Sequence, residues 1–119
     1  MNIPFLHTAV DFSATGSIDV MEIPAQAIPT KYAIQVTGYD AAGVVAAAGA
    51  WDVLLIPSID GAVFDEASKI VEHVNTAQNN GAVVSSGGSF YPARFWQIKC
   101  KALTLGGAAK ITVHVLAVK

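Results

Sequence analysis

Histidine, cysteine and paired carboxylates, the side chains that most often do chemistry, are few in this sequence and stand far apart. The three histidines, His7, His73 and His114, have no second ligand at the short spacings common in metal sites. His114 falls on the polar face of a predicted strand, so we expect it to be solvated or at an interface. Cys100 is the only cysteine, which excludes an internal disulfide and any multi-cysteine metal site. Its neighbouring lysines would point to the opposite face of a strand, so we expect a buried structural thiol rather than a nucleophile.

Three acidic residues that stand close together, Asp60, Asp65 and Glu66, could bind calcium with loop carbonyls. The spacing of an EF-hand loop is absent, and Asp60 precedes Gly61 in a dipeptide typical of tight turns. The glycine-rich stretches lack the Lys-Ser/Thr pair of a phosphate-binding loop. No nucleophile–base pair and no paired carboxylates appear. The sequence therefore predicts a protein that is not an enzyme and that holds no cofactor and no metal.

Aromatic residues gather around one arginine near the end of the chain. Phe90, Tyr91, Phe95 and Trp96 surround Arg94 in the sequence. Such a cluster can anchor a protein interface, stack on a sugar or pack in the core, and all three roles stay open. Because neighbours in a strand point to opposite faces, one of Phe95 and Trp96 must be a core residue.

The composition points to contact with other proteins. Only 13% of the 119 residues are charged, against about 25% in ordinary soluble domains, and 53% are hydrophobic. A small domain has a large surface to cover, so few charges indicate surface that is buried in an interface, or else a neutral surface of Ala, Gly and Ser. The net charge of −2 gives no field that would attract nucleic acid or an anionic membrane. No apolar run approaches the roughly 18 residues of a membrane span.

Strand patterns dominate the chain. Apolar and polar residues alternate over 17–23, 31–38, 93–105 and 110–118, and the nearly continuous apolar run 51–59 predicts a strand buried on both faces or under an interface. Pro57 places the end of that run at an edge or a bulge. The stretch 39–50 fits a loop or a weak strand, and 65–74 fits both a helix and a strand, of which we favour the strand because its neighbours are β.

Turn dipeptides separate these segments at 60–61, 80–81 and 106–107. About seven or eight short strands divided by such turns predict an all-β fold, an antiparallel β-sandwich of jelly-roll type. No linker divides the chain, so residues 1–119 are predicted to form one domain. Residues 1–12 would be either an amino-terminal arm on a neighbour or the first strand of the chain's own sheet.

Several segments together resemble a known family. They are K-Y-A-I-Q-V-T-G, W-D-V-L-L-I-P-S-I-D-G, Y-P-A-R-F-W-Q-I-K-C-K-A and, after a Gly-Gly turn, K-I-T-V-H-V-L-A-V. Over most of residues 17–118 the pattern resembles small virion proteins of tailed bacteriophages, in particular the jelly-roll capsid cement or decoration proteins. The resemblance implies a β-sandwich that forms homotrimers on the capsid surface and clamps neighbouring major capsid protein subunits. It implies no catalytic residues, and it implies assembly of the virion in the host cytoplasm.

The expected function is therefore structural, with the major capsid protein and further copies of the chain as partners, and with no nucleic acid or membrane. The alternatives are a carbohydrate-binding module of a phage tail or fibre, or another head or tail subunit. We expect the contacts to come from 1–12, 51–59 and 90–96. The candidate interface residues are Ile3, Phe5, Leu6, Trp51, Leu55, Phe90, Tyr91 and Arg94.

Overall fold

The computed structural model describes residues 4–18, 21–22, 31–46, 49–75, 80–85 and 95–118. Nine strands and one short 3₁₀ helix lie in these ranges. In chain order they are β1 (Pro4–Phe12), β2 (Gly16–Ser17), β3 (Met21–Glu22), β4 (Lys31–Tyr39), β5 (Ala50–Ser58), η2 (Glu66–Ser68), β6 (Val71–Asn75), β7 (Val83–Ser85), β8 (Phe95–Thr104) and β9 (Lys110–Val118).

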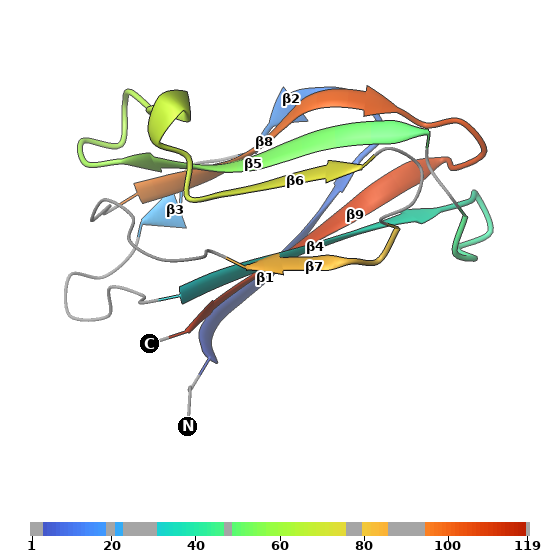
Figure 1. The fold of residues 1–119 in the computed structure, drawn as a ribbon, viewed down its shortest axis with the longest axis horizontal. Helices are drawn as coiled ribbons and strands as arrows, with labels where there is room; N and C mark the ends of the chain where they lie inside the picture. The colour runs from blue at the N-terminus through green and yellow to red at the C-terminus, as the bar shows by residue number, and fades with distance from the viewer. Residues whose placement is uncertain are drawn as a thin grey trace.

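The strands form two antiparallel sheets that pack face to face (Figure 1). One has the order β1-β9-β4-β7, and the other has the order β2-β8-β5-β6, with β3 also paired to β8. Since β2 and β3 run along the same edge of β8, they act as two pieces of one strand. Counted that way, eight strands follow the jelly-roll order, in which the chain crosses repeatedly between the two sheets. The predicted all-β antiparallel sandwich of jelly-roll type is confirmed.

The core lies between the two sheets and follows the predicted alternation. Because side chains in a strand point alternately to the two faces, every second residue of an inner strand faces the other sheet. Burying one large apolar side chain in this way contributes about 1.5–3 kcal/mol. The inward residues of the four long inner strands are almost completely buried: Tyr32, Ile34 and Val36 on β4; Trp51, Val53 and Leu55 on β5; Trp96, Ile98 and Cys100 on β8; Ile111, Val113, Val115 and Ala117 on β9.

Strand β5 is buried on both faces, as its continuous apolar run predicts. Its outward side chains Leu54 and Ile56 are only 1% and 2% exposed. The chain leaves β5, turns back over the end of the strand through η2 and rejoins the sheet as β6. Its backbone is held there by a hydrogen bond of 2.8 Å from Ile70 N–H to the Leu55 carbonyl. Pro57 lies beyond the last residue of β5 that pairs with β6, so its missing N–H interrupts no bond between those two strands.

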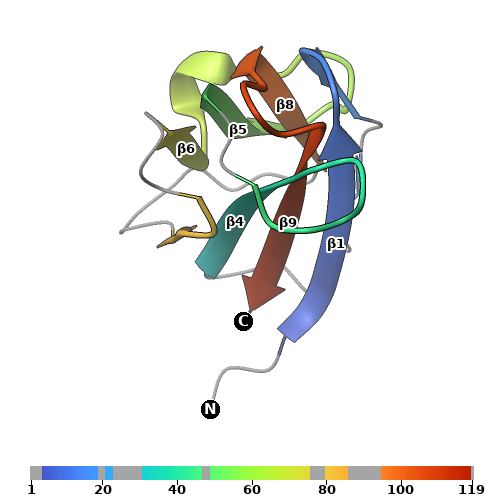
Figure 2. The same cartoon turned by 90° about the vertical axis from the view of Figure 1, so that its right-hand side faces the viewer.

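Two segments with open sequence interpretations are now placed. The strand predicted for 65–74 is correct only in its second half. Asp65 caps the short helix η2, and β6 begins after that helix. Within 39–50, residues 40–46 form a loop after β4, and the Asp40 carboxylate holds it by accepting from the N–H groups of Ala42 and Val44. Residues 4–12 form β1, the edge strand beside β9, rather than an extended arm (Figure 2).

Candidate interaction surfaces

Two of the residues expected at an interface lie in the core. Trp51 is 1% exposed and Leu55 is 0% exposed, because both face the opposite sheet from the inner strand β5. Neither side chain is available to a partner of the folded chain, so the sequence expectation for these two residues is wrong. The run 51–59 is apolar because both faces of β5 are covered within the chain itself.

The other expected contacts fall largely outside the described part of the chain. Ile3, Phe90, Tyr91 and Arg94 lie outside the described residues, and so do the side chains of Phe5 and Leu6, whose backbone belongs to β1. One pair from the aromatic cluster is visible. Trp96 is 0% exposed in the core, while Phe95 points outward, with its ring 3.2 Å from where a Cβ on Gly61 would lie. The deduction that one of these two neighbours must be a core residue is confirmed.

The groups that could do chemistry are engaged in structural roles. Cys100 is a buried thiol, as expected, and burial together with the nearby Asp52 carboxylate raises its pKa to about 11. Asp60 accepts hydrogen bonds from Ser58 Oγ and from the N–H groups of Ala62 and Val63, and these bonds lower the pKa of its carboxyl. Nowhere in the described residues do three His, Cys, Asp or Glu side chains converge as metal ligands would.

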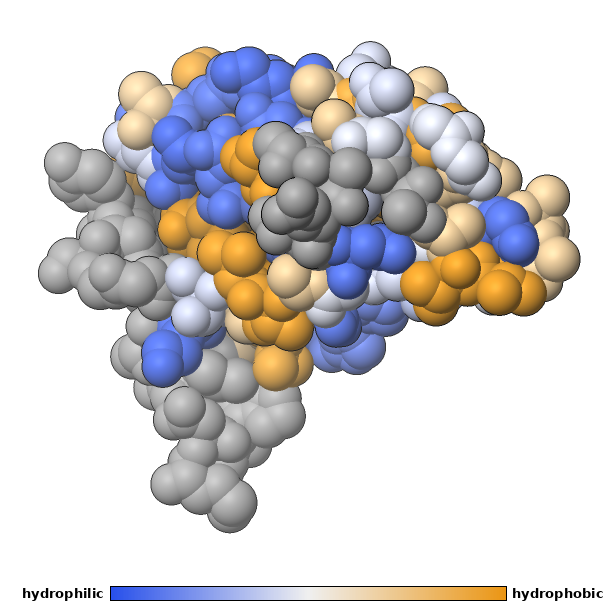
Figure 3. Space-filling model, turned by 45° about the vertical axis from the view of Figure 1, so that its right-hand side comes forward, coloured by the Kyte–Doolittle hydropathy of each residue, from blue (hydrophilic) through white to orange (hydrophobic). Residues whose placement is uncertain are grey.

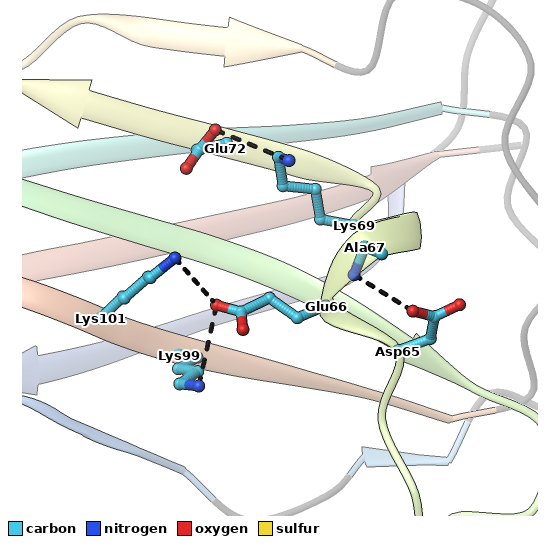
Figure 4. Close-up of polar contacts among 7 residues, drawn as sticks. All are labelled: Asp65, Glu66, Ala67, Lys69, Glu72, Lys99 and Lys101. Carbon is cyan, nitrogen blue, oxygen red and sulfur yellow. Dashed lines mark hydrogen bonds and ion pairs between the residues drawn. The ribbon is translucent and has the colours of Figure 1, made fainter.

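The outer face of the β2-β8-β5-β6 sheet carries charges of both signs that compensate one another. Glu66 reaches across β5, and its Oε1 lies 3.7 Å from Lys99 Nζ and 3.6 Å from Lys101 Nζ on β8 (Figure 4). Lys69 Nζ lies 3.9 Å from Glu72 Oε1 on β6. Glu72 also shares a hydrogen bond with the Asp52 carboxyl, which raises the pKa of Glu72. Covering this face with a partner would be costly, because these charges would lose contact with water.

The outer face of the β1-β9-β4-β7 sheet is different. Its strand register places two cross-strand rows of uncharged side chains side by side. The rows are His7, Leu116, Ala33 and Ser85, and then Ala9, His114, Gln35 and Val83. Asp11 and Lys110 pair with each other at 2.9 Å towards one end of this face, and Lys31 stands at the other. Between them lies a shallow hollow of about 480 Å³, lined in part by His7, Gln35, Val83 and Leu116. We call this surface the neutral face.

Exposed apolar residues also occupy loops at the two opposite ends of the sandwich (Figure 1). Val44 and Val45, in the loop after β4, are each 62% exposed. Figure 3 shows a hydrophobic area, coloured orange, at the right of that view. Ile59 and Val63, in the loop after β5, are 77% and 73% exposed, beside a hollow of about 510 Å³ that Asp60, Asp65 and Ser68 also line. A neutral sheet face and apolar loop tips together suit contact with other proteins.

The sequence alone does not reveal one pairing on the neutral face. His7 Nε2 and His114 Nδ1 lie 3.1 Å apart, with the two rings stacked at a centroid distance of 5.4 Å. These residues are 107 positions apart in the chain, and only the pairing of β1 with β9 brings them together. The one signal in the sequence is that both histidines interrupt alternating strands, on the side opposite the apolar residues of β9.

The sequence matches no protein-family model and no curated protein. Among solved structures, the chain is similar to the PBSX exported protein XepA, with a TM-score of 0.53 and 7% identity over 98% of the chain. It spans 36% of the length of XepA. It is also similar to the SPBc2 prophage-derived protein YomS, with a TM-score of 0.44 and 6% identity over 98% of each chain. At such low identity, what the chain shares with XepA is the fold.

Proposed function

We propose that this protein is a structural component of a bacteriophage particle, and that it decorates the capsid by binding across neighbouring major capsid protein subunits. The observation that carries the proposal is the contrast between the two sheets. One outer face holds a network of charges, while the neutral face presents rows of uncharged side chains. Covering the neutral face with protein costs little desolvation, whereas covering the charged face would strand ions away from water.

The neutral face also has a suitable shape. Its two rows of side chains span all four strands of the sheet around a shallow hollow, and a surface of this breadth fits a large partner better than a small molecule. Val83, 62% exposed, and Leu116, 38% exposed, supply the apolar contact area. A decoration protein is present in many copies, so each contact can be modest while the copies together reinforce the shell.

The phage assignment has two supports. The segments that resemble capsid decoration proteins are the ones that form β4, β5, β8 and β9, and the jelly-roll order agrees with that family's expected architecture. A homotrimer is part of the proposal, because three copies would match a local three-fold axis of a capsid. XepA is an exported protein, and export from the cell is a different destination that the experiment must distinguish from the capsid.

A sugar-binding module is the alternative, and no observation favours it. Both tryptophans are buried, at 1% and 0% exposure, so neither offers a stacking platform for a sugar ring. Phe90 and Tyr91 lie outside the described residues, and their part in sugar binding stays a prediction.

The test uses capsids purified from the phage whose genome encodes the chain, made in a strain that lacks it. Untagged protein is mixed with these capsids and sedimented, and the bound fraction is measured. Val83→Lys puts a charge on the neutral face, and Val74→Lys puts the same charge at an exposed valine of the other sheet. We expect wild-type protein and V74K to sediment with capsids, and V83K to bind at least about tenfold more weakly, because it buries an unpaired ammonium.

Two results would overturn the proposal. Wild-type protein that stays in the supernatant, or that appears only in the culture medium and never on particles, is not a decoration protein. Equal binding by V83K and V74K would remove the neutral face from the interface. Light scattering after size-exclusion chromatography tests the trimer separately, and a stable monomer would remove that part of the proposal.

A further inference from the structure

The histidine pair on the neutral face has the geometry of a chelating site. His7 projects from the edge strand β1 and His114 from its neighbour β9, on the same side of the sheet. One nitrogen of each ring faces the other at 3.1 Å. The two rings are stacked, at 19° to each other, and rotations about their side-chain bonds can turn the in-plane lone pairs of the facing nitrogens towards a common point.

The separation of the nitrogens fits a bound metal ion. Zinc–imidazole bonds are about 2.0–2.1 Å long, and two such bonds to nitrogens 3.1 Å apart make an angle of roughly 98° at the metal. A tetrahedral angle needs a separation of roughly 3.3–3.4 Å with the same bonds, which is about 0.3 Å more than the rings now have. A movement of that size lies within ordinary side-chain motion on an exposed sheet face.

The folded chain also positions the pair in advance. His114 lies on an inner strand, between β1 and β4, and His7 pairs in register beside Leu116. In the unfolded chain the two residues are 107 positions apart, so bringing them together would cost considerable chain entropy. A metal ion therefore binds the folded state far better than the unfolded state, and it should stabilise the fold by mass action.

We propose that His7 and His114 form a two-histidine site for a divalent transition-metal ion on the neutral face. The class of ion is the one that imidazole prefers: Cu²⁺, Ni²⁺ or Zn²⁺. No third His, Cys, Asp or Glu from the described residues joins the pair, so water completes the coordination. The proposal needs no capsid and stands independently of the function proposed above.

The third histidine serves as a built-in control. His73 is 1% exposed, its Nδ1 accepts a hydrogen bond from Trp51 and its Nε2 lies 2.8 Å from the Ala82 carbonyl. Both ring nitrogens are therefore occupied, and His73 cannot compete for metal in the folded protein. Any metal bound by the folded chain through imidazole must use the pair on the neutral face.

The experiment measures binding of Cu²⁺, Ni²⁺ and Zn²⁺ to untagged protein by isothermal titration calorimetry. The variants are His7→Gln, His114→Gln and the double variant, with Gln35→Ala as a control in the same hollow. We expect one ion per chain, with Cu²⁺ bound more tightly than Ni²⁺ or Zn²⁺. Each single variant should lower the affinity by at least about tenfold, and the double variant should lower it little further, because chelation needs both rings. Q35A should bind like wild type.

A second measurement needs no substitution. Cu²⁺ is paramagnetic, so substoichiometric Cu²⁺ should broaden the amide signals around His7 and His114 more strongly than any others in an NMR spectrum. The proposal is overturned if wild-type protein binds no ion more tightly than the double variant does. It is equally overturned if the strongest broadening falls anywhere other than on β1, β9 and the neighbouring strand β4.

Discussion

Trp51 Nε1–H donates a hydrogen bond of 2.9 Å to His73 Nδ1 in the buried interior, where each residue is only 1% exposed. His73 Nε2–H in turn donates to the Ala82 carbonyl at 2.8 Å, which assigns the proton of this imidazole to Nε2. The chain of bonds runs from β5 through β6 to the residue that precedes β7. The two hydrogen bonds therefore link one sheet to the other, and each polar group in this chain of bonds has another of its members as its partner.

His73→Ala should lower the free energy of unfolding by about 2–4 kcal/mol, because it leaves the buried Trp51 N–H and the part-buried Ala82 carbonyl unpaired and opens a cavity. Urea denaturation followed by circular dichroism measures the change. Trp51→Phe removes the donor, and Trp96→Phe is its matched control, since the indole N–H of Trp96 is buried with no acceptor in the described part of the chain. W51F should cost more than W96F, and an equal cost would show that the bond to His73 contributes nothing.

Cys100 should resist modification in the folded protein. Burial and the Asp52 charge raise the pKa of its thiol to about 11, so little thiolate forms at neutral pH, and the residue is only 1% exposed. Labelling with a thiol reagent should be slow in buffer and rapid in urea. Fast labelling in buffer, at a rate that does not change in urea, would contradict the buried position of Cys100.

Glu72→Gln should raise the free energy of unfolding above that of wild type at neutral pH, and this gain should disappear at acid pH. The Asp52 carboxyl beside Glu72 raises the pKa of Glu72 in the folded state above its ordinary 4.5. The folded state therefore binds the proton more tightly than the unfolded state does. The stability that this proton contributes to wild type is lost as the pH rises from the unfolded-state pKa of Glu72 through its higher folded-state pKa. The measurement is the difference in unfolding free energy between wild type and E72Q from pH 4 upwards.

Glu66→Gln is the matched control for that series. It lies on the same face, but Lys99 and Lys101 surround its carboxylate, so its removal should bring no gain at neutral pH. A gain for E66Q equal to that for E72Q would show that general surface charge, rather than the Asp52–Glu72 contact, is responsible.

Gly61→Ala should destabilise the protein more than Gly43→Ala. Both glycines have a left-handed backbone, with φ of 77° and 84°, so each substitution costs about 1 kcal/mol of backbone strain. A Cβ at Gly61 would also meet the Phe95 ring at 3.2 Å, whereas a Cβ at Gly43 meets nothing within 4 Å. Thermal melts of the two variants measure the difference, and equal melting temperatures would show that the Phe95 ring moves aside freely.

The sequence predicts the parts of this fold that depend on local periodicity. The alternation in 31–38 and 110–118 identifies the inward residues Ile34, Val36, Val113 and Val115, because a strand with one buried face must alternate. The run 51–59 is correctly a strand buried on both faces. The sequence does not show which segment covers the outer face of this strand. The covering segment, 65–74, has the pattern of a strand, but its first residues form η2.

The candidate site is predicted less well, for a physical reason. Trp51 and Leu55 looked suited to an interface because hydrophobicity alone cannot distinguish the core from a contact surface. The neutral face and the His7–His114 pair arise from the register between strands that are far apart in sequence. Register depends on the whole sheet, and a single strand's pattern carries no record of its neighbours.

The position of the last two strands has a consequence for how the protein is made. In one sheet β9 lies between β1 and β4, and in the other β8 lies between β2 and β5. A ribosome delivers these two central strands after the other strands of the two sheets, so neither sheet can close until they have emerged. The earlier strands must wait without their partners, and folding then depends on contacts between distant parts of the chain.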